Sequence, residues 1–339
     1  MTSTNNISFM AQSQLQSSRL NDLHNTMNDL QRQVTTLKKF DNFSGLGTDA
    51  VTLQHLRTAS TMTDAYLNNI SASSSHMTLM NQIVTQLSSI GRQMLNSVNT
   101  SDTTNMQSLN TLAQQNLKFV EDLLNQQVDG KYLFAGSDST SQPFIDNSTV
   151  NSNFANQVNT WLVNAAPNAN TTLLNTTDGF TAPQLGLSSG LAASGAVTAH
   201  IDQNTDIDYT VKADAPGFQD LIRSLAFLAN FKAPNPAAGD VATTAQFSAV
   251  LAHITSTLSN SVTEINDTDQ QLTSKFNMIK SVQDNHNSDQ ALLKSQIDSL
   301  ENADPNSAII LMQSLQTQMT ASYQVTKAVS QMSLVNFMP

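Results

Sequence analysis

The fold of this chain is decided by the stretch LNDLHNTMNDLQRQVTTL, residues 20–37. Its apolar residues recur at alternating steps of three and four, the spacing that keeps one side of a helix facing a partner helix. These residues are Leu20, Leu23, Met27, Leu30, Val34 and Leu37. Polar residues fill most other positions, so the apolar stripe is narrow. The pattern predicts a helix over residues 12–38, about 40 Å long, whose stripe needs a second helix to cover it.

A similar pattern lies at the other end of the chain, in AIILMQSLQTQMTASYQVTKAVSQMSLVNFM, residues 308–338. Its apolar positions are Met312, Leu315, Met319, Ala321, Val325, Ala328, Met332 and Val335. We expect this helix to cover the first one, because each carries a stripe that it cannot bury alone. The two stripes together are the predicted assembly seam, with which the chain would also pack beside copies of itself.

Between these ends the sequence predicts further helices and one change of structure. Helical spacing returns after a cap at Thr48 or Asp49, then over 104–128, 218–231 and 244–300. Glycine, proline and small polar residues dominate from Gly130 onward, with strand-like stretches at 196–201 and 206–213. We therefore predict a mainly α fold, a long antiparallel helical or coiled-coil bundle formed by the N- and C-terminal flanks, with a small β-containing inserted domain.

The same pattern predicts three parts, two of them discontinuous in sequence. Residues 1–40 with 301–339 would form a terminal coiled-coil segment, and residues 41–136 with 214–300 a helical rod domain. Residues 137–213 would form a small β-rich surface insert.

Composition excludes several classes of partner. The chain carries 15 basic and 26 acidic residues, a formal charge of -11, so nucleic acid and anionic membrane are poor partners. Cysteine is absent, which removes disulfides and thiolate chemistry. No apolar run approaches the roughly 18 residues of a membrane-spanning helix. The first ten residues lack the pattern of a cleavable signal peptide, so export from the cell would use another route.

No motif in the sequence predicts an enzyme. The sequence spacing of the histidines is not that of metal ligands, and no nucleophile elbow or phosphate-binding glycine loop occurs. Asp202, Asp206 and Asp208 resemble a calcium loop only faintly, since the required glycine and terminal glutamate are missing. We expect no catalytic residue, no cofactor and no metal site. The histidines are His24, His55, His76, His200, His253 and His286.

Three stretches resemble the flagellin superfamily, and among its members the proteins of the hook–filament junction. The C-terminal helix, residues 308–338, is similar to the C-terminal helix of that family. GKYLFAG at 130–136, followed by QPF at 142–144, resembles the segment with which junction proteins leave the helical core. ADAPGFQDLIRSLAFL at 213–228 resembles the return into it.

This resemblance implies a structural component of the bacterial flagellum, exported unfolded through the type III channel and located outside the cell at the hook–filament junction. Its partners would be other copies of itself, the neighbouring axial proteins on the hook and filament sides, and an export chaperone. The resemblance also implies terminal helices with little stable structure in the monomer. A filament flagellin subunit is the first alternative, and a secreted coiled-coil effector or tip protein the second. A coiled-coil signalling rod is disfavoured, because it would carry a membrane span and a charged helical tip.

Overall fold

The computed structural model describes the backbone of residues 3–99 and 105–337, and the side chains from Ala11 to Ala328 except those at 12, 13, 43 and 100–104. The chain divides into two compact units, Met1–Asp64 with Asn287–Pro339 and Ala65–His286. None of the described helices is both long enough and apolar enough to cross a bilayer.

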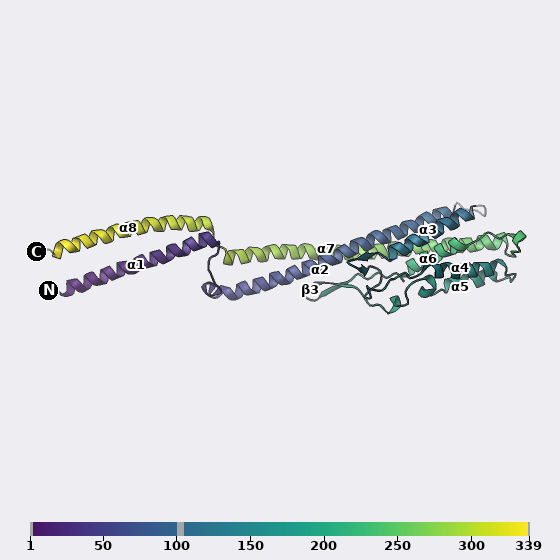
Figure 1. Ribbon diagram of the computed structural model, residues 1–339, viewed down its shortest axis with the longest axis horizontal. Coiled ribbons are helices and arrows are strands. Elements are labelled where there is room, and N and C mark those ends of the chain that lie inside the picture. Colours follow the sequence, from purple (N-terminus) through teal and green to yellow (C-terminus); the bar gives the residue numbers. More distant parts are fainter. Residues whose placement is uncertain (1–2, 100–104, 338–339) are drawn as a thin grey trace. The chain divides into compact units, whose positions relative to one another are not determined.

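The first unit contains an antiparallel pair of long helices, α1 (Ser3–Thr36) and α8 (Pro305–Phe337). Figure 1 shows them side by side, with the start of α1 and the end of α8 at the same end of the pair. The prediction that the first helix pairs with the last is confirmed, because Leu30 of α1 packs with Ala308 and Leu315 of α8. A short helical turn, η1 (Phe43–Leu46), follows α1.

Two longer helices, α2 (Asp49–Asn99) and α7 (Thr244–Glu301), run through both units. The predicted start of α2 near Thr48 or Asp49 and the predicted span of α7 are confirmed. Within the second unit the two helices are linked by polar bonds. Ser88 Oγ donates to Asn266 Oδ1 over 2.7 Å, and Asn81 Nδ2 donates to Thr273 Oγ1 over 2.9 Å.

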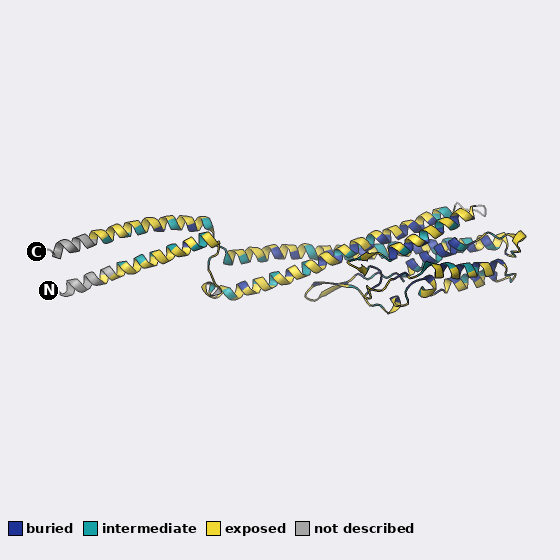
Figure 2. Ribbon diagram, in the orientation of Figure 1, coloured by how far each residue is buried: buried dark blue, intermediate teal, exposed yellow. Residues whose placement is uncertain are grey.

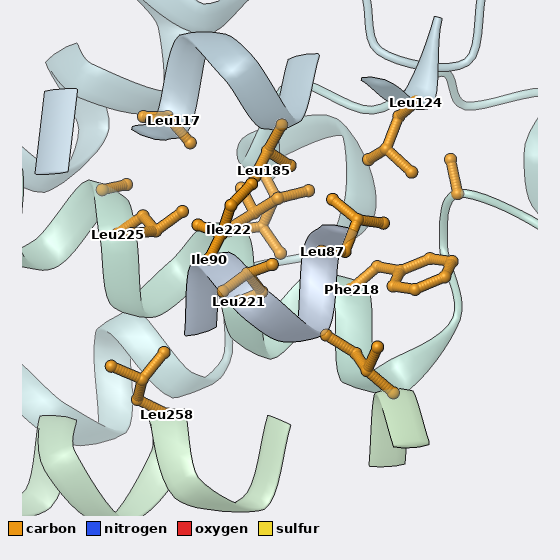
Figure 3. Close-up of a cluster of buried hydrophobic side chains, with 14 of the residues drawn as sticks. Leu87, Ile90, Leu117, Leu124, Leu185, Phe218, Leu221, Ile222, Leu225 and Leu258 are labelled. Carbon is orange, nitrogen blue, oxygen red and sulfur yellow. The ribbon is translucent and has the colours of Figure 1, made fainter. Parts of the chain in front are cut away.

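The core of the second unit lies where α2 and α7 meet two shorter helices, α3 (Met106–Leu124) and α6 (Pro216–Asn230). Figure 3 shows leucine, isoleucine and phenylalanine side chains from these helices converging. Helix α6 is buried over most of its surface, from Gly217 to Ala229. Because so much apolar surface is removed from water here, this unit has the larger share of the hydrophobic stabilisation.

The segment predicted as a β-rich insert contains more helix than strand. It contains α4 (Asn147–Leu162) and α5 (Ala169–Asp178), followed by the short turns η2 (Ala182–Leu185) and η3 (Leu191–Ala193). The composition from Gly130 onward did not reveal these two helices, because many polar residues mask the apolar spacing. Buried Val150, Phe154, Val158 and Trp161 recur at steps of four and three, which is helical periodicity.

The strands of the second unit form two small antiparallel hairpins. The first joins β1 (Gln127–Val128) to β2 (Lys131–Tyr132), and the second joins β3 (Thr198–Asp202) to β4 (Thr205–Asp208). The second hairpin confirms the predicted strands near 196–201 and 206–213, although β4 ends at Asp208. The short turn η4 (Pro236–Ala238) precedes α7.

Candidate assembly surface on the terminal helices

The contact between α1 and α8 is a narrow apolar stripe. Leu30, Ala308 and Leu315 are buried in it, and Leu23, Val34 and Met312 pack around them. Figure 2 shows mostly exposed surface on both helices outside this line. Among the side chains described on α1 and α8, those three alone are fully buried. The pair is therefore held by little apolar area.

The covered stripe follows heptad spacing along both helices. On α1 the half-buried Leu20 and Met27 occupy the same side as Leu30, as predicted from their spacing. On α8 the stripe runs through Met312, Leu315 and the half-buried Met319, and then continues through the half-buried Ser322 and Thr326. The C-terminal part of this contact is therefore polar, which the apolar pattern alone could not indicate.

Val325 and Ala328 do not lie in the covered stripe. Val325 is 53% exposed and Ala328 is also exposed. The predicted C-terminal seam joined two different stripes, since the step from Met319 to Ala321 is two residues. At 100° per residue, the line through Ala321, Val325 and Ala328 lies about 130° around the helix from the covered stripe.

This second line is a solvent-facing apolar stripe, which we call the outer stripe. It consists of Ala321, Val325 and Ala328. Leu311, which is 55% exposed, lies about 40° around the helix from Val325, with the polar Ser314 and Gln318 between. Met332 and Val335, which were predicted in the same seam, have side chains that lie outside the described residues.

Leu37 also lies outside the covered stripe. Helix α1 ends at Thr36, and Leu37 is 51% exposed with a φ of 58°. A leucine in this left-handed conformation is uncommon, and it marks the point where the chain leaves the helix. The backbone N–H of Ala303, which lies just before α8, donates to the Leu37 carbonyl over 3.0 Å. The Leu37 backbone therefore contacts the segment that leads into α8.

A group of charges fixes the same junction. The half-buried Glu301 carboxylate pairs with Lys38 at 2.7 Å and with Arg57. Burial alone would raise the pKa of Glu301, but the hydrogen bonds and charges of the two cations outweigh burial and lower it. The backbone N–H of Lys39 also donates to the Glu301 carbonyl over 2.8 Å. These contacts join the end of α1 to the end of α7.

One polar contact bridges α1 and α8 farther from the junction. The Tyr323 hydroxyl lies 3.3 Å from His24 Nε2, and His24 Nδ1 lies 2.9 Å from the Leu20 carbonyl. Since a carbonyl only accepts, Nδ1 carries the proton, and Nε2 of the neutral ring accepts from Tyr323. The contact is exposed, so it contributes more to the alignment of α1 against α8 than to the stability of the pair.

Other sites considered from the sequence have local structural roles. Asp206 lies 2.5 Å from His200 Nδ1, and Asp208 accepts from the Thr210 hydroxyl. Asp202 accepts from the backbone N–H of Gln203. Within residues 3–99 and 105–337, no three His, Asp or Glu side chains gather as a metal site requires.

Comparisons with known proteins give structural likenesses alone. No model of a known protein family matches the sequence, and no curated protein matches it. A solved structure of a putative flagellar hook-associated protein from Vibrio parahaemolyticus is similar over 74% of this chain and 96% of its own, with 11% identity and a TM-score of 0.49.

A second solved structure, that of FlgL from Bacillus cereus, is similar over 75% of this chain and 99% of its own. Its identity to this chain is 13% and its TM-score 0.36. At these identities and scores, neither likeness assigns a function to this chain.

Two features of the terminal helices, the outer stripe and the Glu301 contacts, were not predicted from the sequence. The outer stripe could have been found from the two-residue step after Met319. The Glu301 contacts could not, because Lys38, Arg57 and Glu301 are distant in sequence and single charges carry no pattern.

Proposed function

We propose that this chain is a structural, non-enzymatic subunit of the bacterial flagellum that assembles by packing of its terminal helices. The observation that carries the proposal is the outer stripe of α8, which α1 leaves exposed. Helices that present a second apolar line need a further helix to cover it. In the proposed assembly, a neighbouring subunit supplies that helix.

The two stripes of α8 would have separate tasks. The covered stripe pairs α8 with α1 inside one subunit, while the outer stripe would contact the terminal helices of neighbours. Covering a half-exposed residue such as Val325 contributes about 1 kcal/mol. Repeated along the helix and around a ring of subunits, such contacts would stabilise a tubular lattice without any tightly bound pair.

Within the flagellum we propose the hook–filament junction as the position of this chain. The proposal rests on the resemblance of residues 130–136 and 142–144 to junction proteins. In the structure this run lies at the neck of the inserted segment, where the backbone N–H of Ala213 donates to the Phe134 carbonyl over 2.9 Å. Gly136, with a φ of 67°, turns the chain away at that point.

The remaining parts of the proposal follow from the same resemblance. The chain would be exported through the type III channel with an export chaperone, and would join hook-side and filament-side axial proteins outside the cell. Residues 1–40 with 301–339 would form the inner layer, residues 41–136 with 214–300 the next layer, and residues 137–213 the outer part. A filament flagellin is the first alternative and a secreted effector or tip protein the second.

The test is a charge placed on the outer stripe. Val325→Asp leaves the α1–α8 contact intact, because Val325 is exposed in the monomer, but it would bury a carboxylate in the proposed lattice. Thr320→Asp is the matched control, since Thr320 is exposed on the side of α8 that carries neither stripe. Decoration of purified hooks is scored by electron microscopy.

We expect Val325→Asp protein to fold as the wild type does and to leave hooks bare, while Thr320→Asp protein decorates them. Normal decoration by Val325→Asp protein would refute the role of the outer stripe. Loss of decoration in both variants would mean that α8 as a whole, and not this stripe, is sensitive to charge.

A further inference from the structure

A hollow of about 320 Å³ lies in the second unit, far in sequence from the terminal helices. One wall is α2, and the others are strand β2 with the loop after it, the start of β3 and the segment after β4. Its volume lies at the small end of the range for small-molecule sites.

The floor of this hollow is apolar. Met80, Leu133 and Val211 line it and are buried. The Tyr209 ring adds a further wall. Its hydroxyl is hydrogen-bonded to Ser73, and burial raises the pKa of that hydroxyl. A ligand that fills the hollow therefore needs an apolar body.

Lys131 is the one charged residue among those that line the hollow, and His76 lines it as well. His76 is half-buried and Lys131 is exposed, and no Asp or Glu lines the hollow. In a chain with 26 acidic and 15 basic residues, this is a local reversal of the charge balance. Neither His76 nor Lys131 has an ion pair or side-chain hydrogen bond among the described residues.

Two acidic residues lie close in sequence to this lining, Asp129 before β2 and Asp138 after it, and neither lines the hollow. Asp138 lies between the lining residues Ser137 and Ser139, and its carboxylate accepts from Ser141 at 2.6 Å and from Thr140 at 3.2 Å. The two basic side chains therefore remain available to a ligand.

Hydroxyl groups also line the hollow. Ser137 accepts from the Gly195 N–H, which leaves its own O–H to donate.

We propose that this hollow binds a small molecule with one carboxylate and an apolar body. The carboxylate would lie between Lys131 and His76 and accept from the hydroxyl groups, while the apolar body would cover Met80, Leu133 and Val211. An ammonium head group would meet two basic side chains, and a purely apolar molecule would leave them unpaired. This binding does not depend on the packing of the terminal helices, because none of these residues lies on α1 or α8. Lys131 and Leu133 do belong to the run 130–136 that supports the junction position.

The test uses benzoate as the probe and benzamide as its neutral counterpart of the same shape. Binding is followed by NMR through the methyl group of Met80, which lines the floor, with its signal identified by Met80→Leu. We expect benzoate to shift this signal saturably in the millimolar range, and benzamide to shift it far less.

Two variants remove the basic groups, and one provides the control. Lys131→Gln should weaken benzoate binding by about two- to fivefold, as the loss of an ion pair with an exposed side chain does, and His76→Gln should weaken it as well. Lys280→Gln, which removes one positive charge from an exposed position on α7, should leave the affinity unchanged. Unchanged thermal melting would show that each variant is folded.

Three results would overturn the proposal. These are the absence of a saturable shift with benzoate, equal affinity for benzamide, and equal affinity of wild-type and Lys131→Gln protein for benzoate. The second result would mean that the hollow selects apolar shape alone.

Discussion

Replacement of Leu30 by aspartate tests whether the apolar stripe between α1 and α8 holds the terminal pair together. Leu30 is 7% exposed and packs with Ala308 and Leu315. Leu15, which is 62% exposed on the same helix, provides a control with the identical substitution. The two substitutions are chemically identical, and they differ only in how far the replaced leucine is buried.

The magnitude follows from burial. Removing the buried leucine costs about 1.5–3 kcal/mol of transfer free energy, and an unpaired carboxylate in its place costs several more. We expect Leu30→Asp to destabilise the pair by about 4 kcal/mol or more. Leu15→Asp should change it by less than about 0.5 kcal/mol, as exposed substitutions do.

The wild-type pair should itself be only weakly stable, because three buried side chains are found among those described on α1 and α8, two helices of more than 30 residues each. An opening free energy of about 1–3 kcal/mol corresponds to roughly 5- to 150-fold slowing of amide exchange. Millisecond hydrogen exchange with mass spectrometry resolves this range for peptides of α1 and α8.

Leu30→Asp should remove this slowing in both α1 and α8, while peptides of the buried helix α6 remain strongly protected. The reasoning is refuted if Leu30→Asp leaves α1 and α8 exchanging as in the wild type, or if Leu15→Asp has the same effect. Strong protection of residues 12–38 in the wild-type monomer would contradict the weak pairing itself.

Two further predictions concern the second unit. A methyl group on Gly91 would lie 2.6 Å from Val262 Cγ2. For Gly91→Ala, the overpacking of about 1–3 kcal/mol should therefore outweigh the helix-propensity gain of about 1 kcal/mol. Adding Val262→Ala should restore stability in denaturant unfolding, and additive losses in the double variant would contradict the contact. Asp146 caps α4, and hydrogen bonds from Thr149 and Ser148 lower its pKa from 3.8 to about 2. Because the folded pKa is the lower one, this stabilisation is present above about pH 4 and lost as the pH falls through about 2. Asp146→Asn keeps a capping side chain but cannot titrate, so its melting temperature should fall less between pH 4 and pH 2, and an unchanged acid profile would count against the cap.

The parts of the fold that the sequence predicted are those with long, regular apolar spacing. Leu20 to Val34 and Met312 to Met319 repeat at steps of three and four, and the structure pairs them. The same spacing predicted α6 and α7. In each case one periodic signal extends over several turns, so single exceptions do not hide it.

The parts that were missed depend on contacts between distant residues or on breaks within a pattern. Leu37 fits the heptad spacing, but backbone bonds at the end of α1 place it outside the helix. Val325 fits a heptad as well, though not the heptad of Met319. The helices α4 and α5 were hidden by asparagine and threonine at their exposed positions. Lys131 and His76 come together only through the fold.

The central claim, that this chain assembles at the hook–filament junction, is tested most directly by electron microscopy of the purified full-length protein. The protein is examined alone, with purified hooks, and with short filament seeds under salting-out conditions. The account predicts monomers when the protein is alone and short caps on the added hooks. Long tubes, grown spontaneously or from the seeds, would contradict it and indicate a filament flagellin.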